Sequence, residues 1–370
     1  MMGGNPHYVE QGYVTLGMID AGSGGVVSGT LMAVPFNAER LQVLGQRIPV
    51  TDSVQIGLNS RAAKLGISRR GTLAFASGTV GMSSLVAATR TGTVRELSAQ
   101  PKFYAAPRLS PDGARIAVVV NDVGTDIWMH DMAARTLSRL TFDRSGQRPA
   151  WTPDGRRVVY ERRGSESADL AWIAADGSSQ AESLTVAPQD QVVESFTPDG
   201  RTMVIAEALL GGKRSISTVN MDSARKPTSL LSSETQNFSL SLSPDGHWMA
   251  YVSDETGRLE VYVRPFPGPG GRWQISKDGG NEPRWSPTGR EIFFRSGTAM
   301  MAADVQAGTQ FASGAVRELF RTTAASSTFH TNYDVTRDGQ TFIMVQPKAS
   351  NDQNVVILLN WFENLVGSRK

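Results

Sequence analysis

The chain has 370 residues, of which 40% are hydrophobic, 37 are glycine and none is cysteine. The absence of cysteine excludes disulfide bonds and thiolate metal sites. The 37 basic and 35 acidic residues are interspersed and leave a net charge of +2, which gives no electrostatic case for a nucleic-acid partner or an anionic membrane. Residues 1–9 lack the basic and apolar segments of a signal peptide, and no apolar run is long enough to span a membrane. We therefore expect a soluble chain that does not insert into membranes.

The first predicted unit is the least regular part of the chain. Strands are predicted at residues 6–9 and 13–18, on either side of a turn at Gly12. The next predicted strand, Gly29–Phe36 (GTLMAVPF), has a near copy downstream at Gly297–Ala303 (GTAMMAA). Each copy is followed by a polar loop and a further strand. This match predicts that the N-terminal segment is a four-stranded unit whose turn has lost the usual sequence.

From Leu109 onward one turn motif recurs, in which a large apolar residue is followed by Ser or Thr, Pro, Asp and Gly. Ser or Thr opens the turn, Pro presets φ near −65°, Asp accepts local hydrogen bonds and Gly takes the position with φ > 0. An apolar run such as Ile116–Val120 follows each turn, so the motif predicts two strands joined by the turn. With its degenerate copies, the motif predicts eight turns, ending at Gly12, Gly71, Gly113, Gly155, Gly200, Gly246, Gly289 and Gly339.

The turn glycines from Gly71 onward recur at intervals of 42 residues (Gly71 to Gly113) to 50 residues (Gly289 to Gly339). Such a period is typical of an array of four-stranded blades. The sequence therefore predicts an all-β fold, a single β-propeller domain over residues 1–370. Eight blades are preferred, and seven follow if the first segment completes the last blade. The last unit lacks a clear fourth strand, which predicts that the two termini pair to close the ring and hide a sheet edge.

The Ser-Pro-Asp-Gly turn followed by an apolar strand resembles the TolB-type propeller family, which is itself similar to the propellers of prolyl-oligopeptidase-like and tricorn peptidases. A narrower set of phrases resembles the C-terminal propeller of bacterial serine/threonine protein kinases and covers nearly the whole chain. The phrases are Gly29–Phe36, Asp126–Trp128 (DIW), Arg139–Phe142 (RLTF), Glu260–Pro267 (EVYVRPFP) and Leu358–Phe362 (LLNWF). The resemblance implies a sensing or interaction module, extracytoplasmic if it belongs to a membrane kinase and otherwise cytoplasmic.

The chain lacks the sequence signals of the common catalytic sites. It has no glycine-rich loop ahead of a Val-Ala-Ile-Lys strand, no His-Arg-Asp, no Asp-Phe-Gly and no Gly-x-Ser-x-Gly. The repeated aspartates occupy one slot of one turn and are predicted turn formers, and the tryptophans are predicted to pack between blades. The four histidines are His7, His130, His247 and His330. Only His7 and His330 fall on predicted inner strands, at different depths, so no metal site is predicted. We expect neither a cofactor nor enzyme activity.

The candidate binding site is the central pore. The inner strand of each blade lines the pore, so residues just before each turn should lie at its mouth. A ring of unlike polar groups around one cavity is a usual place for ligand binding. Arg148 and Glu282 bring opposite charges, which suits a zwitterionic or peptide-like ligand. Because these side chains are expected to face solvent, their removal should cost little stability. The predicted site residues are Tyr104, Arg148, Glu194, Asn237, Asn281, Glu282, His330 and Asn332.

Two classes of function fit these observations. The favoured one is a non-catalytic, monomeric propeller that binds a peptide, a glycan, a protein partner or a small polar ligand at the pore mouth. The alternative is a propeller-type enzyme, such as a metal-dependent lactonase or lyase, or the accessory propeller of a peptidase. A metal-dependent enzyme needs several histidines or carboxylates level with one another around the pore, and the predicted inner strands supply too few.

Overall fold

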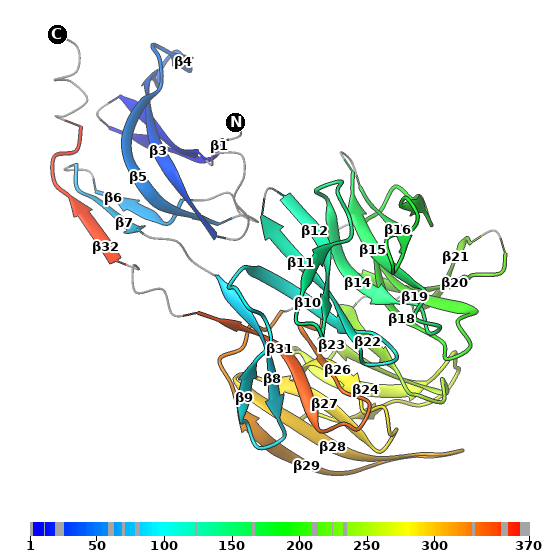
Figure 1. Cartoon of the computed structure of the whole chain (residues 1–370). Helices are drawn as coiled ribbons and strands as arrows, with labels where there is room; N and C mark the ends of the chain where they lie inside the picture. Colours follow the sequence, from blue (N-terminus) through cyan, green and yellow to red (C-terminus); the bar gives the residue numbers. More distant parts are fainter. Residues whose placement is uncertain are drawn as a thin grey trace. The chain divides into compact units, whose positions relative to one another are not determined.

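The structure is a computed structural model that describes residues 3–10, 12–18, 26–57, 63–68, 71–77, 82–122, 124–164, 167–208, 214–223, 225–231, 235–327, 330–348 and 354–362. Every regular secondary-structure element in these residues is a β-strand, which confirms the all-β prediction. Contacts divide the chain into two compact units (Figure 1). One comprises Met1–Met82, Asn121–Gly124 and Lys348–Lys370, and the other Ser83–Val120 and Thr125–Pro347. The single domain expected from the repeats is thus replaced by a propeller unit and a smaller sheet unit. In the described part of the chain, no helix is long and apolar enough to cross a membrane.

The propeller unit consists of six four-stranded antiparallel sheets, or blades. Five of them follow the chain in order, each running from its innermost to its outermost strand. Their strands are β10 (Phe103–Leu109), β11 (Arg115–Asp122), β12 (Gly124–Asp131) and β13 (Leu137–Arg139); β14 (Gly146–Trp151), β15 (Arg157–Arg163), β16 (Ala168–Ala174) and β17 (Glu182–Ser183); β18 (Gln191–Phe196), β19 (Thr202–Ala208), β20 (Arg214–Asn220) and β21 (Pro227–Leu231); β22 (Asn237–Leu242), β23 (Trp248–Ser253), β24 (Glu260–Pro265) and β25 (Trp273–Gln274); β26 (Asn281–Trp285), β27 (Glu291–Ser296), β28 (Ala299–Ala307) and β29 (Phe311–Arg321).

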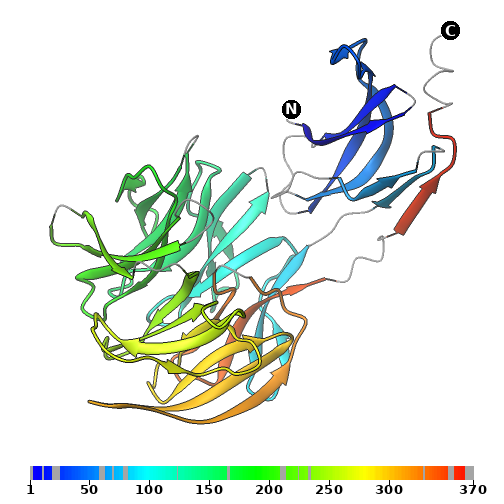
Figure 2. The ribbon, with the colours of Figure 1, turned by 180° about the vertical axis from the view of Figure 1, so that it is seen from behind.

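The sixth blade closes the ring. Its inner strands come late in the chain and its outer strands come early, in the order β30 (Tyr333–Val335), β31 (Thr341–Pro347), β8 (Ser83–Thr89) and β9 (Val94–Glu96). Distant segments therefore close the ring, as expected, although they are not the termini themselves. The innermost strands lie toward the middle of the unit, whereas β29 runs along its edge in both views (Figures 1 and 2).

A buried apolar cluster lies between each pair of neighbouring blades. Val158 and Tyr160 of β15 pack toward the preceding blade, whereas Val159, between them, packs toward the next blade. The six clusters around the ring follow the same arrangement. Because both faces of a blade are covered, its strands are continuous apolar runs rather than alternations. Trp151 and Trp285 are buried in these clusters, as predicted, whereas Trp128 and Trp172 are only partly buried.

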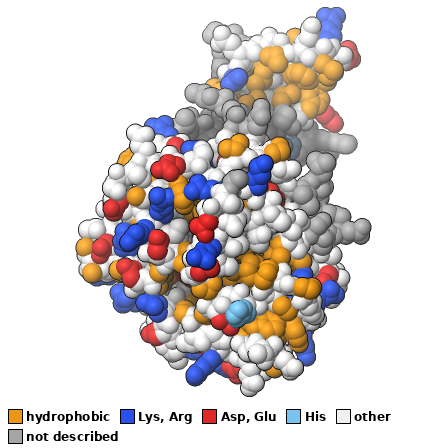
Figure 3. All heavy atoms as spheres, turned by 90° about the vertical axis from the view of Figure 1, so that its right-hand side faces the viewer, with side chains coloured by type: hydrophobic (Ala, Val, Ile, Leu, Met, Phe, Trp, Pro, Cys, Tyr) orange, Lys and Arg blue, Asp and Glu red, His pale blue; other side chains and the backbone are white. Residues whose placement is uncertain are grey.

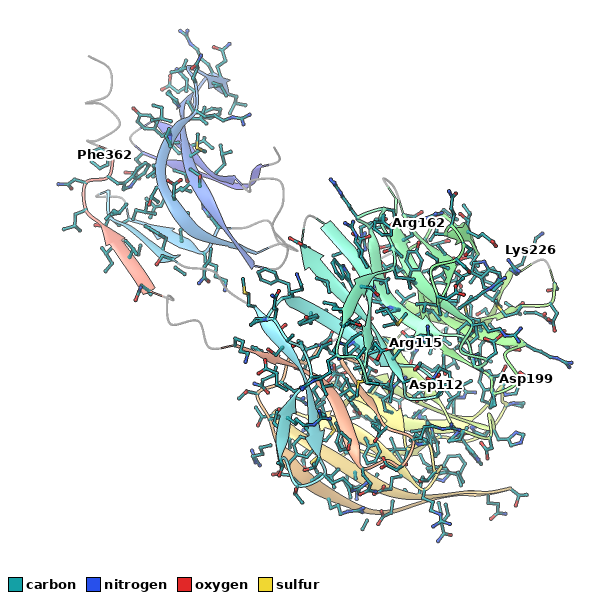
Figure 4. The ribbon with its side chains drawn as sticks, viewed as in Figure 1. Asp112, Arg115, Arg162, Asp199, Lys226 and Phe362 are labelled. Carbon is teal, nitrogen blue, oxygen red and sulfur yellow. The ribbon has the colours of Figure 1, made fainter. Side chains whose placement is uncertain are left out.

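The repeated motif forms the turn that its residues predict. In the blade that begins at β10, the Gly113 amide donates to the Ser110 carbonyl (2.8 Å), and Gly113 has φ 76°. Asp112 Oδ1 accepts hydrogen bonds from Ser110 Oγ (2.5 Å) and the Ala114 amide (2.9 Å). Asp199, labelled with Asp112 in Figure 4, accepts the equivalent pair of bonds. These contacts confirm the aspartates as turn formers, and the hydroxyl bond is the main cause of the lowered pKa of Asp112.

The smaller unit contains one eight-stranded sheet. Its order is β1-β2-β3-β5-β7-β32, with β4 paired to β3 and β6 paired to β7. The apolar cluster of this unit includes Tyr13, Phe75 and Trp361, all buried. The neighbouring Phe362 (labelled in Figure 4) packs against Gly71, where an added Cβ would lie 1.8 Å from the Phe362 ring. The strands are β1 (Gly3–Val9), β2 (Tyr13–Met18), β3 (Val26–Asn37), β4 (Gln42–Val43), β5 (Ile48–Gly57), β6 (Leu65–Ile67), β7 (Leu73–Ser77) and β32 (Asn354–Leu358).

The ring has six blades, not the eight or seven expected, and the reason is an exchange of strand partners. Strands β6 and β7 do not continue their sheet with β8 and β9; β8 pairs instead with β31, and β9 pairs with β8. Leu73 of β7 pairs with Leu358, and Thr341 of β31 pairs with Thr89. Leu73 and Thr341 each stand two residues after a turn glycine, so equivalent strands of two repeats have different partners. The N-terminal repeat does form the expected four strands, β1, β2, β3 and β5, but within the smaller unit.

Candidate functional site

A repeated β-bulge shapes the innermost strands of the propeller. The register of β14, β22 and β26 shifts between the residues eight and five positions before the turn glycine, and β18 has a similar shift. Ala106, Arg148, Ser239 and Glu282 each stand seven residues before their turn glycine and have φ between 45° and 55°. A bulge interrupts the alternation of side chains between the two faces of a strand. It therefore separates the pore-lining residues into a group beyond the bulge, near the turns, and a deeper group.

The group near the turns surrounds a cavity of about 350 Å³, which we call the mouth cavity. Five of the six blades contribute to it, so it lies on the axis of the propeller. The volume lies in the range of ligand-binding pockets, which are about 300–1,000 Å³. The mouth cavity is lined by Arg108, Leu109, Ser110, Pro111, Ala150, Trp151, Pro153, Glu194, Ser195, Phe196, Arg284, Pro287, Asp334, Val335 and Arg337.

Three arginines give the mouth cavity its charge. Arg284 forms an ion pair with Asp334 (2.8 Å). Arg108 instead donates to backbone carbonyls, with its Nη1 bonded to Pro107 and its Nη2 to Thr331 (both 2.8 Å). Burial, and then the neighbouring Arg284, lower the pKa of Arg108 to about 10, so it stays charged at neutral pH. Arg337 is exposed and has no ion pair with the described residues.

Among the described residues, Glu194 is the one carboxylate lining the mouth cavity that forms no ion pair. Its Oε2 accepts a hydrogen bond from the Leu240 amide of the next blade (2.9 Å), whereas its buried Oε1 has no hydrogen-bond partner among the described residues. Burial raises the pKa of Glu194 to about 7 against the pull of nearby arginines. This carboxyl group is therefore protonated more readily than a carboxyl group in water, and one of its oxygens has no partner among the described residues.

The deeper group connects the innermost strands to one another. Glu282 is fully buried, and its Oε1 accepts hydrogen bonds from the Ser327 amide (2.9 Å) and the Asn332 amide (2.8 Å). Asn332 Oδ1 in turn accepts from the Ala106 amide of the following blade (2.7 Å). The expectation that Glu282 faces solvent and adds little to stability is therefore wrong, because its carboxylate satisfies buried amides between two blades.

Charged groups of the deeper level also influence one another. Arg148 pairs with the fully buried Glu161 of the same blade. His330 accepts from or donates to Ser327 Oγ through Nδ1 (2.8 Å), and burial together with Arg148 and Arg108 lowers its pKa to about 3. The structure thus brings Arg148, Glu282, His330 and Asn332 into one layer beneath the mouth cavity, and Glu194 into the cavity itself.

The remaining predicted site residues lie elsewhere or serve local contacts. Asn281 donates to the Ser327 carbonyl (2.7 Å), close to Glu282. Asn237 is buried at the start of β22, with its Nδ2 3.4 Å from the Thr235 carbonyl. Tyr104 lines a separate cavity of about 160 Å³ with His130 and Trp128, and its hydroxyl donates to the Gln100 carbonyl (3.1 Å). Tyr104 is therefore not brought together with the pore residues.

Sequence reasoning missed Arg108, Arg284, Asp334 and Arg337. The first three share a slot five residues before the turn glycines Gly113, Gly289 and Gly339. This position comes after the bulge in the inner strand. The predicted site residues occupy positions in the bulge or before it. Charged residues at this slot in three repeats were the available signal. This signal could be interpreted only with knowledge of the bulge, because the bulge determines which side chains reach the mouth cavity.

On the face shown in Figure 3, basic and acidic side chains are interspersed over the described residues. In the described ranges, no group of three or more His, Asp or Glu side chains is placed to hold a metal ion. His7 is exposed, and burial lowers the pKa of His130.

The ring of blades is a β-propeller, and its fold is similar to those of solved TolB structures. A TolB candidate from Agrobacterium tumefaciens has a TM-score of 0.59 and 19% sequence identity, covering 74% of this chain and 100% of that chain. TolB from Acinetobacter baumannii has a TM-score of 0.50 and 16% identity, covering 93% and 81%. Hydrazine synthase from Kuenenia stuttgartiensis has a TM-score of 0.50 and 17% identity, covering 78% and 95%. No protein-family model matches the chain. At these identities the likeness concerns the fold alone.

Proposed function

We propose that this protein is a non-catalytic binding propeller that takes a peptide segment of a protein partner in the mouth cavity. The supporting observation is the composition of that cavity, where Arg337, a free oxygen of Glu194 and the apolar side chains of Trp151 and Phe196 meet in about 350 Å³. Ligand sites combine apolar walls with a few convergent polar groups in this way. A peptide offers both kinds of group, with side chains for the walls and amides or charges for the polar groups.

The sequence motifs that resemble those of kinase-associated propellers support the further proposal that the module serves a bacterial receptor-type serine/threonine kinase. In this role the propeller would recognise a partner while the chemistry is carried out elsewhere. The protein would act as a monomer, since one propeller contains the whole mouth cavity.

Substitution of Arg337 should weaken peptide binding without changing the fold. A library of random dodecapeptides with free carboxyl ends would be selected on the wild-type protein, and the selected peptides measured by fluorescence polarisation. Because Arg337 is exposed and lines the cavity, we expect Arg337→Glu to weaken binding at least tenfold.

Arg156→Glu is the matched control. Arg156 is also an exposed arginine beside a repeated turn, but it lines a groove between two blades and not the mouth cavity. The control should bind within about twofold of wild type, since isolated surface charges have small effects. Selection of no peptide, or equal losses in both variants, would contradict the proposed function.

A further inference from the structure

The mouth cavity has a floor. Directly beneath it, Glu282 and Asn332 are buried and bonded between neighbouring inner strands. Thr331, whose carbonyl holds Arg108, is buried as well. We expect these groups to obstruct the pore below the cavity, so that an extended chain that enters the mouth meets hydrogen-bonded side chains. A chain end is therefore accommodated more readily than the middle of a chain that would have to turn back within about 350 Å³.

The charges in the mouth cavity favour one anionic group. Arg284 is already paired with Asp334. Arg108 is held by neutral carbonyls, and no ion pair joins it to a carboxylate in the described part of the chain. A partly buried cation of this kind is stabilised when a ligand brings a negative charge. The exposed Arg337 adds a second positive charge at the rim of the same cavity.

Glu194 distinguishes a carboxylate from a dianion. Its buried Oε1 has no partner in the described residues, and in the protonated form of the group this oxygen donates a hydrogen bond to a carboxylate. A second ligand charge, as on a phosphate, would lie close to the carboxylate of Asp334, which lines the same cavity. Like charges at short range are unfavourable, so a single negative charge matches the cavity better.

Building on the proposed function, we infer that the mouth cavity recognises the C-terminal carboxylate of an extended peptide, bound by Arg108 and Arg337 with the free oxygen of Glu194 as a third contact. Charge-assisted bonds from arginine to a carboxylate are among the strong hydrogen bonds in proteins. The residues preceding the terminus would then contact Trp151, Phe196 and the turn prolines along the wall.

The test uses a peptide selected from the library in three synthetic forms. These are the free acid, its C-terminal amide, and the free acid with every internal Asp and Glu replaced by Asn and Gln. We expect the amide to bind the wild-type protein at least tenfold more weakly than the acid, and the third form to bind like the acid. Weakening by internal replacement with no effect of amidation would assign the carboxylate to a side chain and overturn the inference.

The variant Arg337→Gln provides a second test, which compares the affinities of the acid and the amide. If Arg337 contacts the terminal carboxylate, the preference for the acid over the amide should be clearly smaller in this variant than in the wild type, because the variant has lost one of the contacts that only the acid makes. An acid-to-amide ratio that is as large in the variant as in the wild type would exclude Arg337 from the contact. Equal binding of acid and amide to the wild type, with Arg337→Glu still weakening both, would overturn this inference and leave the proposed function standing.

Discussion

Replacing Gly246 by alanine should cost more stability than the same change at Gly113. Both glycines end a repeated turn, with φ of 74° at Gly246 and 76° at Gly113, so both variants bear the cost of a left-handed alanine, about 1–2 kcal/mol. A Cβ at Gly113 meets nothing within 4 Å, whereas at Gly246 it would lie 2.8 Å from Cδ of Pro198, in the preceding turn. The rigid proline ring cannot easily move away from the added Cβ. Such overpacking adds about 1–3 kcal/mol to the loss of stability.

Urea unfolding of both variants measures this difference directly. Ala114→Ser, at an exposed position one residue past a turn, is the control and should unfold within about 0.5 kcal/mol of wild type. The same midpoint for Gly246→Ala and Gly113→Ala would show that neighbouring turns do not pack against one another as the structure has them.

The second large effect is expected at Glu282. Glu282→Ala removes the acceptor of the buried Ser327 and Asn332 amides and should destabilise the protein by about 3–5 kcal/mol. Glu282→Gln keeps an oxygen at the Oε1 position and places an amide where Oε2 has no partner among the described residues. The glutamine variant should therefore fold with nearly wild-type stability at neutral pH, and only the alanine variant should unfold early in urea.

The same carboxyl makes stability depend on pH. Burial raises the pKa of Glu282 from 4.5 to about 7, against the effect of the Ser327 and Asn332 amides and of Arg295 and Arg108. Between these values the folded protein holds a proton that the unfolded chain has released, so the contribution of Glu282 to stability falls as the pH rises from about 5 to 7. A pKa difference of this size corresponds to about 3 kcal/mol.

Glu282→Gln should accordingly lose less stability than the wild type between pH 5.5 and pH 8. Glu194, whose pKa is also raised to about 7, remains in the variant and leaves a residual slope of the same sign. Chemical unfolding at several pH values provides the comparison. A variant whose stability changes with pH as steeply as that of the wild type would show that Glu282 is ionised throughout.

The local features of the fold could be predicted from the sequence. The turns from Gly113 to Gly339 depend on residues adjacent in the chain, and so does the confirmed series of strands that they join. The blade count could not be obtained in this way. Strands β7 and β31 are both short apolar segments that follow a turn glycine, and backbone hydrogen bonds do not distinguish whether β8 pairs with one or the other. That choice is made by contacts between residues far apart in the sequence.

The location of the candidate site could be predicted from the sequence, but only some of its residues could. Counting back from the turn glycines located the pore and identified Glu194 in the mouth cavity. The positive φ at Arg148 and Glu282 was not visible in the sequence, since neither residue type favours that conformation. The resulting bulges shift the pore-facing position, so that Arg108 and Arg284 reach the mouth and Glu282 is buried between blades.

The central claim is that a peptide binds in the mouth cavity, and site-directed photo-cross-linking tests it most directly. A photoreactive benzoylphenylalanine would replace Pro287, an exposed turn residue that lines the mouth cavity, or Pro244, the equivalent exposed proline of the preceding blade, which lines a different groove and not the mouth cavity. With a selected peptide and ultraviolet irradiation, mass spectrometry should find the peptide attached at position 287 and not at position 244. Attachment at 244 alone, or at neither position while the peptide remains bound, would contradict the account.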